Sequence, residues 1–471
     1  MARRKIILYN PKAVFYTMPL GLMAVGSALD PARYDVQIVD GRLLDNPLQT
    51  LLPLLDDALC LGVTTLTGDP IRDALKVTRA AKAYRPDLPI IWGGWHASLF
   101  PEQTLQEPCI DATVQAQGEL TFAAMLERLQ VGQWFDGVPG CTTRVDGRIV
   151  RNPPRPMTPM NQLPPVNYDL INVPQYFQLK RDRQLDYISS TGCFFRCAFC
   201  ADPFVFGRKW SGIEPTRIAD ELEGLWHRHH FHDVAFQDET FFTYNDRVIE
   251  MAEEFLRRGL KFTWTATMRA DQGSRLSEEA LQLCIRAGLR WLMIGVEAGS
   301  QQMLDHLKKD VKIEQIVELA QRCARHGVKG VFPHIVGFPG ESDASIQATL
   351  NMATKLRRMH SSFETPVFYF KPYPGSLITD QATAAGYRLP DSLEEWANFD
   401  FVAGASGPWV STQQYQMVER FKFYNRMAGG RKSPIKWPLQ QLARWRLRQQ
   451  NFRFPIEQKI IERIKPLPKM S

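Results

Sequence analysis

The first part of the chain alternates short apolar, β-rich runs with amphipathic stretches. In the amphipathic stretches, apolar residues recur every three or four positions, which is the period of a helix buried on one face. The apolar runs are 5–9, 34–39, 58–63, 89–94 and 110–115, and the helical stretches include 70–84 and 119–129. Alternation at this pace predicts a parallel sheet covered by helices on both faces, a doubly wound domain. Ligands of such sheets bind at the carboxyl ends of the strands.

A second alternating block begins at about residue 185. Its six apolar runs are 185–190, 233–238, 261–267, 290–297, 329–337 and 366–371. The helical stretches between them are 216–228, 246–259, 277–288, 313–327 and 345–359. Six strand–helix units in series predict a parallel, incomplete barrel, because a full barrel of this kind has eight. The chemistry of such barrels also lies at the carboxyl ends of the strands.

These patterns divide the α/β chain into four parts. Residues 1–135 form the doubly wound, Rossmann-like domain, and residues 183–388 form the partial (β/α)6 barrel. Between them, 136–182 is rich in proline, which predicts a stiff, extended connector. Beyond the barrel, the pattern thins into a helical extension, 389–471, with a basic tail.

Composition narrows the class of protein. At 471 residues and 44% hydrophobic, the chain is long enough for two or three globular domains. We expect neither a signal peptide nor a spanning helix, because no uninterrupted apolar run is long enough. Five of the eight cysteines stand singly and three are clustered, which is typical of a reducing compartment and predicts a cytoplasmic protein.

The positive charge is concentrated in the tail. Residues 420–471 hold 14 Lys and Arg against 2 Glu, a net charge of +12, whereas the rest of the chain carries −5. Tryptophan and phenylalanine alternate with these basic residues, a pattern typical of peripheral contact with an anionic membrane. A helix packed on the barrel with its charges in water explains the same pattern. Nucleic acid is not favoured as a partner, because no known RNA-binding module accompanies the tail.

The segment 190–200, STGCFFRCAFC, places Cys193, Cys197 and Cys200 within eight residues, directly after the first strand of the barrel. Four cysteines complete the coordination of an ordinary 4Fe–4S cluster, so three on one tight loop leave one iron open to an external ligand. The alternative is a zinc loop with its fourth ligand elsewhere, but zinc loops usually supply their ligands in pairs. The spacing therefore favours an open iron–sulfur cluster.

With this motif, the second block resembles the radical S-adenosylmethionine enzymes. The resemblance implies that the open iron binds S-adenosylmethionine and that the cluster cleaves it to a 5′-deoxyadenosyl radical. It also implies a flavodoxin- or ferredoxin-type electron donor. It assigns Phe199 to the adenine, Gln237, Asp238 and Glu239 to the ammonium group, Arg269 to the carboxylate, Glu297 and Ser300 to the ribose, and Gly337 to the backbone along the adenine.

Three of these assignments have a structural alternative. Glu297 is also a carboxylate suited to a helix N-terminus, where the macrodipole favours negative charge. Arg269 is equally explained as half of an ion pair. Gly337 lies in the sequence GFPG, where glycine and proline serve to make a turn.

The first block resembles the cobalamin-binding domain that precedes the barrel in many radical S-adenosylmethionine enzymes. The matching segments are 10–30, 38–42, 62–70 and 92–105. One departure matters, because the Asp-x-His-x-x-Gly loop that supplies a histidine to cobalt is absent after the first strand. We therefore expect cobalamin without a protein ligand on cobalt. His96 follows the fourth strand and is expected to line the pocket of the nucleotide tail or to pack.

Among two-domain enzymes, the chain most resembles the anaerobic magnesium-protoporphyrin monomethyl ester cyclase and the hopanoid methylases. The shared segments are 367–387, 393–401 and 421–426. This resemblance implies C-methylation of a hydrophobic substrate, an isoprenoid lipid or a tetrapyrrole, in which a substrate radical receives a methyl group from cobalamin. The alternative is oxidative cyclisation or another radical rearrangement. A non-catalytic cobalamin sensor is disfavoured, because a sensor has no need of the three thiols.

Overall fold

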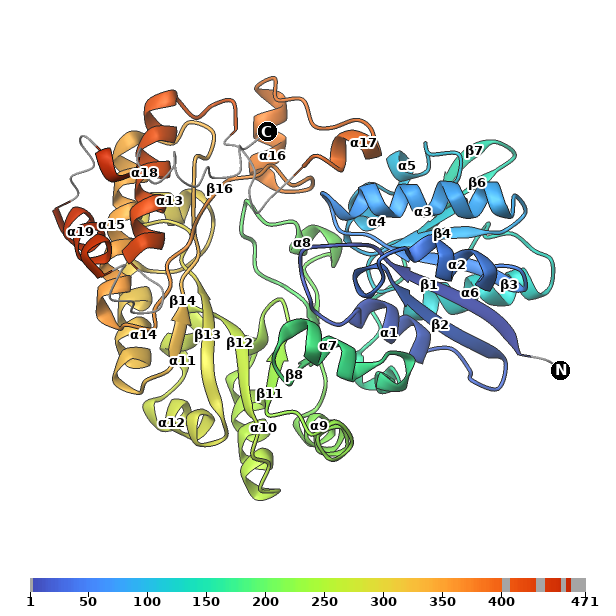
Figure 1. Ribbon diagram of the computed structural model, residues 1–471, viewed down its shortest axis with the longest axis horizontal. Helices are drawn as coiled ribbons and strands as arrows, with labels where there is room; N and C mark the ends of the chain where they lie inside the picture. The colour runs from blue at the N-terminus through green and yellow to red at the C-terminus, as the bar shows by residue number, and fades with distance from the viewer. Residues whose placement is uncertain (1–2, 400–406, 429–436, 450–454, 459–471) are drawn as a thin grey trace.

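The computed structural model describes residues 3–399, 407–428, 437–449 and 455–458. The chain forms two α/β bodies side by side, with the N-terminal domain on the right of Figure 1 and the barrel on the left. None of the helices in the described ranges is long and apolar enough to cross a membrane.

The N-terminal domain is built on one seven-stranded sheet in the order β2-β1-β3-β4-β5-β6-β7. Successive side chains of β1 point to opposite faces of the sheet. Ile7 and Tyr9 pack under α2 and α3, whereas Ile6 and Leu8 pack under α1 and α6. Both faces are therefore covered, which confirms the doubly wound prediction. The elements are β1 (Arg4–Asn10), α1 (Leu20–Ser27), β2 (Tyr34–Asp40), α2 (Pro47–Leu54), β3 (Ala58–Thr64), α3 (Pro70–Tyr84), β4 (Ile90–Gly93), β5 (Ala112–Val114) and α6 (Glu119–Gln130).

The proline-rich segment 136–182 differs from the expected extended connector. It begins with a hairpin of β6 (Cys141–Val145) and β7 (Arg148–Arg151), which pairs antiparallel with β5 and extends the N-terminal sheet. The hairpin turns at Asp146 and Gly147, both with positive φ, the conformation that an Asp-Gly pair favours between two strands. The segment 136–182 also contains α7 (Val173–Lys180), which has a proline in its first turn, where proline is tolerated.

The second body is a partial barrel of six parallel strand units, as the sequence predicts. Five strands form the sheet β14-β13-β12-β11-β8, and β15 pairs with β16 beside it. Isolated bridges between Glu297 and His334 and between Val331 and Glu364 join the two sheets. The fifth unit is split because Pro333 has no N–H for the ladder. The strands are β8 (Gln184–Tyr187), β11 (Asp233–Phe236), β12 (Thr263–Arg269), β13 (Leu289–Gly295), β14 (Lys329–Val331), β15 (His334–Val336) and β16 (Val367–Tyr369).

Helices cover the outside of the barrel and bury an extensive apolar core. The fully buried side chains include Trp264 and Phe255. The helices are α9 (Pro215–His229), α10 (Asn245–Arg257), α12 (Glu278–Arg286), α13 (Gln301–His306), α14 (Ile313–Arg325) and α15 (Asp343–Met359).

The C-terminal extension contacts both bodies. Its short helix α17 (Leu393–Trp396) packs on α3 of the N-terminal domain, where Trp396 is fully buried. Two later helices, α18 (Thr412–Ala428) and α19 (Trp437–Gln449), pack on each other, and α18 packs on α15 of the barrel. The helical part of the expectation for 389–471 is therefore confirmed within the described residues.

Candidate cluster and cofactor site

The three clustered cysteines lie on a loop at the carboxyl end of the first barrel strand. After β8 the chain forms β9 (Ser190–Gly192), which pairs antiparallel with β10 (Trp210–Gly212). Gly192 has φ +84°, and a Cβ there would lie 2.3 Å from the Lys209 carbonyl oxygen, so only glycine fits directly before Cys193. The loop therefore starts from a fixed point.

Contacts from distant segments hold the rest of the loop. The backbone N–H of Ala198 donates to the carbonyl of Leu307 at 2.8 Å, and its carbonyl accepts from the N–H of Ile378 at 3.0 Å. Arg196 forms a two-pronged ion pair with Asp310, with both nitrogen–oxygen distances 2.8 Å. These contacts preorganise the loop independently of any ligand.

The thiols have the chemistry of cluster ligands. Burial raises the pKa of Cys193 to about 11, and burial together with the Asp202 carboxylate also raises the pKa of Cys200. Both are therefore thiols in the free protein, and a bound metal centre is what would deprotonate them. Within the described residues, no three His, Cys, Asp or Glu side chains converge as ligands of a single ion. In a 4Fe–4S cluster each thiolate binds its own iron, so three thiols on one loop fit a cluster with one open iron.

Arg269 lies directly against this loop. Its guanidinium donates to the Cys197 sulfur at 3.4 Å, to Asp271 at 2.9 Å and to the carbonyl oxygen of Lys309, and it stacks 3.7 Å from the Phe195 ring centroid. The sequence assigns this residue to the methionine carboxylate of S-adenosylmethionine. In the structure, the guanidinium already contacts Cys197, Asp271, Lys309 and Phe195 in the absence of that ligand.

Glu297 is the carboxylate of a buried ion pair. It follows β13 with φ +62°, a left-handed conformation that is costly for glutamate and is typically kept at functional sites. Its partner is Lys309, only 4% exposed, which the sequence analysis did not single out. A Cβ at Gly295 would lie 2.5 Å from the Glu297 carboxylate, so glycine leaves room for this pair. Nothing in the Lys308–Lys309 pair of the sequence distinguished the buried lysine from its exposed neighbour.

The three polar residues after β11 point in different directions. Asp238 is buried and accepts from the Ser189 N–H at 2.8 Å and from the hydroxyls of Ser189 and Ser190, so it anchors the strand that leads into the cluster loop. Gln237 donates to Asp186 at 2.9 Å. Glu239 is exposed and accepts from the Gly192 N–H at 3.2 Å. Glu239 is therefore the one of the three beside the cluster loop.

The other assigned residues occupy defined positions near the barrel mouth. The Phe199 ring lies 6.3 Å from that of Phe338 in a T-shaped pair. Ser300 caps α13 by accepting the Met303 N–H at 3.2 Å, a role for which serine is well suited. Gly337 has φ +75°, donates its N–H to Glu341 at 2.7 Å and accepts from the Trp409 indole at 2.6 Å. Their roles toward S-adenosylmethionine stay predictions.

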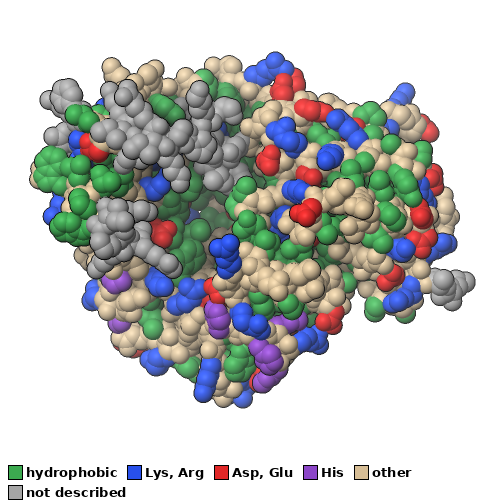
Figure 2. All heavy atoms as spheres, in the orientation of Figure 1, with side chains coloured by type: hydrophobic (Ala, Val, Ile, Leu, Met, Phe, Trp, Pro, Cys, Tyr) green, Lys and Arg blue, Asp and Glu red, His purple; other side chains and the backbone are tan. Residues whose placement is uncertain are grey.

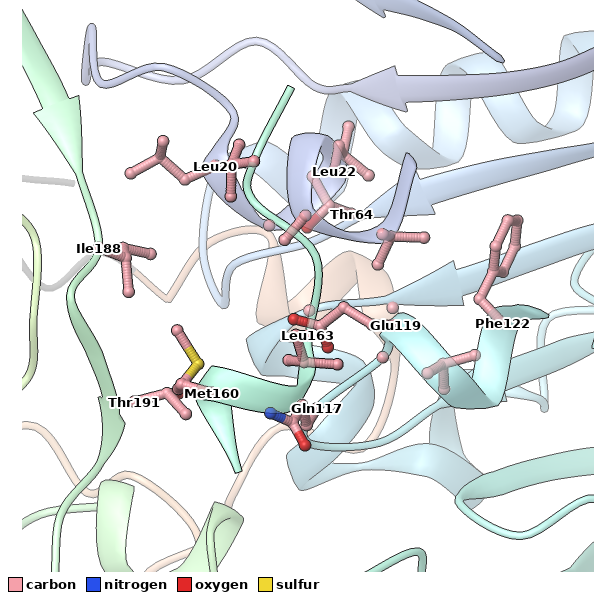
Figure 3. A pocket seen from close by; sticks show the side chains of 18 of the residues that line it. Leu20, Leu22, Thr64, Gln117, Glu119, Phe122, Met160, Leu163, Ile188 and Thr191 are labelled. Atoms are coloured by element: carbon pink, nitrogen blue, oxygen red, sulfur yellow. The ribbon is translucent and has the colours of Figure 1, made fainter. Parts of the chain in front are cut away.

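A cavity of about 230 Å³ is lined by residues of both bodies. On the N-terminal side it forms a slot between the sheet and helices α1 and α6, and several of the residues that line this slot are glycines. A Cβ at Gly21 would meet nothing within 4 Å, and one at Gly93 only Val114 at 3.9 Å, so the missing side chains leave the slot open. Figure 3 shows side chains from both bodies around it, and in Figure 2 hydrophobic side chains surround a hollow between the two halves. The lining includes Leu8, Leu22, Ile91, Phe122, Met160, Leu163, Ile188, Thr191 and Phe206.

The slot fits the cofactor that the sequence predicts. Cobalamin has a long nucleotide arm, and an apolar slot opening at the carboxyl ends of β3 and β4 would hold such an arm. His96 is not part of the slot. It is fully buried, its Nδ1 lies 3.2 Å from the Thr67 hydroxyl, and its ring packs against Trp396 at 5.7 Å. Of the two expectations for His96, packing is the one that the structure confirms.

Comparison with protein families matches each body separately. Residues 7–126 match the B12 binding domain, and residues 187–353 match the Radical SAM superfamily. The first match spans the doubly wound sheet from β1 to α6, and the second spans the barrel from the end of β8 into α15. These matches give the two bodies their cofactors: cobalamin for the first, and a 4Fe–4S cluster with S-adenosylmethionine for the second.

Several curated proteins are similar over much of their length. An uncharacterized methyltransferase from Pyrococcus horikoshii is 28% identical over 81% of this chain and 82% of its own. The cytidylyl-2-hydroxyethylphosphonate methyltransferase of Streptomyces wedmorensis is 24% identical over 89% of both chains. The anaerobic magnesium-protoporphyrin IX monomethyl ester cyclase of Rubrivivax gelatinosus is 28% identical over 62% of this chain and 53% of its own. The hopanoid C-3 methylase of Methylococcus capsulatus is 24% identical over 82% and 75%.

Solved structures confirm the arrangement of the two bodies. The radical S-adenosylmethionine methyltransferase TsrM from Kitasatospora setae superposes with a TM-score of 0.70 at 19% identity, over 82% of this chain and 77% of that one. At this identity, the similarity shows the fold: a doubly wound domain followed by a partial barrel.

Proposed function

We propose, from the premise that this chain is a cobalamin-binding radical S-adenosylmethionine enzyme, that it transfers a methyl group to an unactivated carbon of a hydrophobic substrate. One observation carries the proposal. The cavity joins the carboxyl ends of both sheets, because Thr64 and Gly94 of the N-terminal domain line it together with Thr191 and Phe206 from the cluster side. Groups bound in the two bodies would therefore face a common space.

The chain's own residues bind and enclose the reactants in this proposal. The bound cofactors would supply the radical and the methyl group, which no side chain can supply. Cys193, Cys197 and Cys200 hold the cluster, and Arg269 fixes the loop that carries them. The apolar lining of the cavity keeps water from a reactive substrate radical.

Oxidative cyclisation is the second candidate, supported by the similarity to the tetrapyrrole cyclase. The two reactions differ in what becomes of S-adenosylmethionine. A methylase consumes it both as methyl donor, leaving S-adenosylhomocysteine, and as radical source, leaving 5′-deoxyadenosine, whereas a cyclase requires only the second. We expect the anaerobic, cobalamin-loaded protein with a strong reductant to form both products from labelled S-adenosylmethionine. Formation of 5′-deoxyadenosine alone would favour the cyclase.

The cluster cysteines provide the control. Changing Cys193, Cys197 and Cys200 together to Ala should abolish iron and sulfide binding and the formation of 5′-deoxyadenosine. Changing the buried, isolated Cys284 and Cys323 to Ala should leave the iron content unchanged. Cleavage of S-adenosylmethionine by the triple variant would contradict the radical mechanism altogether.

The C-terminal helices support peripheral contact with an anionic membrane, where an isoprenoid lipid or a tetrapyrrole would be collected. On α19, Trp437 and Trp445 are 57% and 48% exposed, although Ala443 and Leu447 pack against α18. A groove between α15 and α19 is lined by Lys355, Arg358 and Arg448, for which no acidic partner lies among the described residues. Phe452 and Phe454 of the predicted aromatic pattern lie outside the described residues.

Vesicle binding tests this contact. We expect the full chain to sediment with anionic vesicles at low salt, and raised salt to weaken the binding because it screens the basic residues. Changing Trp437 and Trp445 to Ser should release the protein. Removing everything after Glu419 is a poor test, because α18 supplies the buried residues Phe421 and Tyr424. A full chain that stays in the supernatant with anionic vesicles at low salt would contradict the membrane proposal.

A further inference from the structure

One buried carboxylate lies where the two bodies of the molecule meet. Asp186 belongs to β8, the first strand of the barrel, and is 0% exposed. One of its oxygens accepts from the backbone N–H of Met18 at 2.8 Å and from the Lys180 ammonium at 2.5 Å, and the other accepts from the Gln237 amide at 2.9 Å. A buried carboxylate is costly unless donors satisfy it, and here three donors do so.

The three donors come from different parts of the fold. Met18 lies near the end of the loop between β1 and α1, Lys180 ends α7 of the connector, and Gln237 directly follows β11 of the barrel. Both β8 and α7 lie at the boundary of the two bodies in Figure 1. The Met18 side chain is buried in the core of the barrel, although it belongs to the N-terminal domain. Asp186 is therefore a joint between the bodies.

The loop between β1 and α1 lies at the carboxyl end of β1, the edge at which ligands of such sheets bind. Its Val14 and Tyr16 side chains are exposed. Arg42 holds the middle of the loop by donating to the Phe15 carbonyl at 2.7 Å, and Asp186 holds its end. The contact with Asp186 thus determines how this edge of the N-terminal domain faces the barrel.

We propose that Asp186 is a positioning residue, which sets the distance and orientation between the two cofactors by anchoring the loop after β1 to the barrel. This inference rests on the proposed function, because it needs a cofactor in each body. Apolar packing alone would hold the bodies together without fixing one orientation, whereas a carboxylate with donors in three directions fixes it. Misplacement of reacting groups by about 1 Å can slow a reaction about a hundredfold.

The experiment uses the full-length chain with its cluster loaded. Hydrogen exchange of the backbone amides, followed by mass spectrometry before cobalamin is added, measures the anchoring alone. We expect residues 12–18 to exchange about tenfold faster in Asp186→Ala than in the wild type, because the Met18 N–H loses its charged acceptor.

Paramagnetic resonance then measures the positioning itself. With cob(II)alamin bound and the cluster reduced, the magnetic coupling between the two spins falls steeply with their separation. We expect one defined coupling in the wild type and a spread of couplings in Asp186→Ala. Asp186→Glu keeps the charge but lengthens the side chain, so it should give one defined coupling of a different strength. This variant decides the question if Asp186→Ala does not fold.

Asp233 provides a matched control at the opposite end of a barrel strand. It is the first residue of β11, is equally buried, and accepts from Arg290 and Gln184, each at 2.6 Å. Asp233→Ala removes a comparable carboxylate and should change neither the exchange of residues 12–18 nor the spin coupling.

The outcomes separate this inference from the proposed function. A coupling unchanged in both Asp186 variants, or changed equally by Asp233→Ala, would overturn the inference. A wild type that holds both cofactors without a defined coupling would overturn it as well. A wild type that binds no cobalamin would instead overturn the proposed function.

Discussion

At the scale of single residues, Arg269 connects the cluster loop to the barrel. Its donation to the Cys197 sulfur stabilises negative charge there, and negative charge on the cluster increases when it is reduced. Arg269→Lys keeps the positive charge but loses the fork of donors, so we expect the cluster to become harder to reduce. A lost charge-assisted hydrogen bond corresponds to a potential more negative by roughly 60 mV for one electron.

A redox titration followed by electron paramagnetic resonance measures this shift. The control is Arg196→Lys, because Arg196 lies on the same loop but pairs with Asp310 at the surface. A potential unchanged in Arg269→Lys, with full iron content, would show that the contact to Cys197 does not stabilise the reduced cluster.

The buried histidines predict how stability depends on pH. Burial lowers the pKa of His96 from about 6.5 to about 3, so the folded protein keeps it neutral where the unfolded chain takes up a proton. Its contribution to stability is complete above pH 6.5 and is lost as the pH falls toward 3, by about 2 kcal/mol at pH 5. His334, with a pKa lowered to about 4, acts in the same direction.

Thermal unfolding between pH 7.5 and 5 should show this dependence. His96→Asn should reduce the slope of the unfolding free energy against pH at the acid end by the equivalent of one proton taken up on unfolding. The asparagine can keep the contact with Thr67. His227→Asn, on the exposed end of α9, is the control and should leave the slope unchanged. An equally steep dependence in His96→Asn would contradict the assignment.

Single residues also show what the sequence could predict about the site. The spacing of Cys193, Cys197 and Cys200 predicts the cluster ligands because a local motif carries the chemistry, and the structure places all three on the loop after β9. Lys309 was missed because its partner Glu297 is twelve residues away, and only the turn after α13 brings them together. Asp238, which the resemblance assigns to the ammonium group, also accepts hydrogen bonds from Ser189 and Ser190, a contact that the sequence did not predict. That contact joins two strands, which a pattern along the chain does not reveal.

At the scale of elements, the most consequential contact is that of α17 with the N-terminal domain. The Trp396 ring packs against that of Phe100, with the ring centroids 4.5 Å apart, and its indole N–H donates to Gln103 at 2.8 Å. Trp396→Ala would leave a cavity in this core, and large aromatic deletions typically cost about 3–5 kcal/mol. We expect the N-terminal domain to unfold at a clearly lower urea concentration.

Trp437→Ala is the matched control, because Trp437 is exposed and should change stability by no more than about 0.5 kcal/mol. The far-UV signal and cobalamin binding, followed together, would report unfolding of the N-terminal domain. Equal effects of the two substitutions would mean that α17 does not contribute to the stability of this domain.

Regular elements were the most predictable part of the fold. Strand and helix periods identified every parallel strand of the two sheets, because each carries a buried face of its own. The hairpin β6–β7 was missed because the prolines around it dominate the local composition. Its Asp146–Gly147 turn was the available signal. The docking of α17 had no signal at all, since its partner α3 lies about 310 residues earlier.

At the scale of the whole molecule, the N-terminal domain extends beyond the predicted boundary at residue 135. The strands β6 and β7 continue its sheet, and Val138 and Cys141 are buried in its core. Met160 and Leu163 then form a wall of the slot. A fragment of residues 1–166 retains all of these, whereas a fragment of residues 1–135 exposes the short edge strand β5 for pairing with other chains.

Both fragments lack α17, so they differ only in residues 136–166, and we expect fragment 1–166 to bind cobalamin at least tenfold more tightly than fragment 1–135 and to aggregate less. Size-exclusion chromatography and titration with cobalamin measure the two properties. In the full-length protein, the paramagnetic resonance of bound cob(II)alamin should show no nitrogen coupling from the protein, because His96 is buried against Thr67 and Trp396. Equal binding by the two fragments would mean that the wall formed by Met160 and Leu163 does not contact the cofactor. A nitrogen coupling lost in His96→Asn would show that this histidine leaves its packed position to reach cobalt.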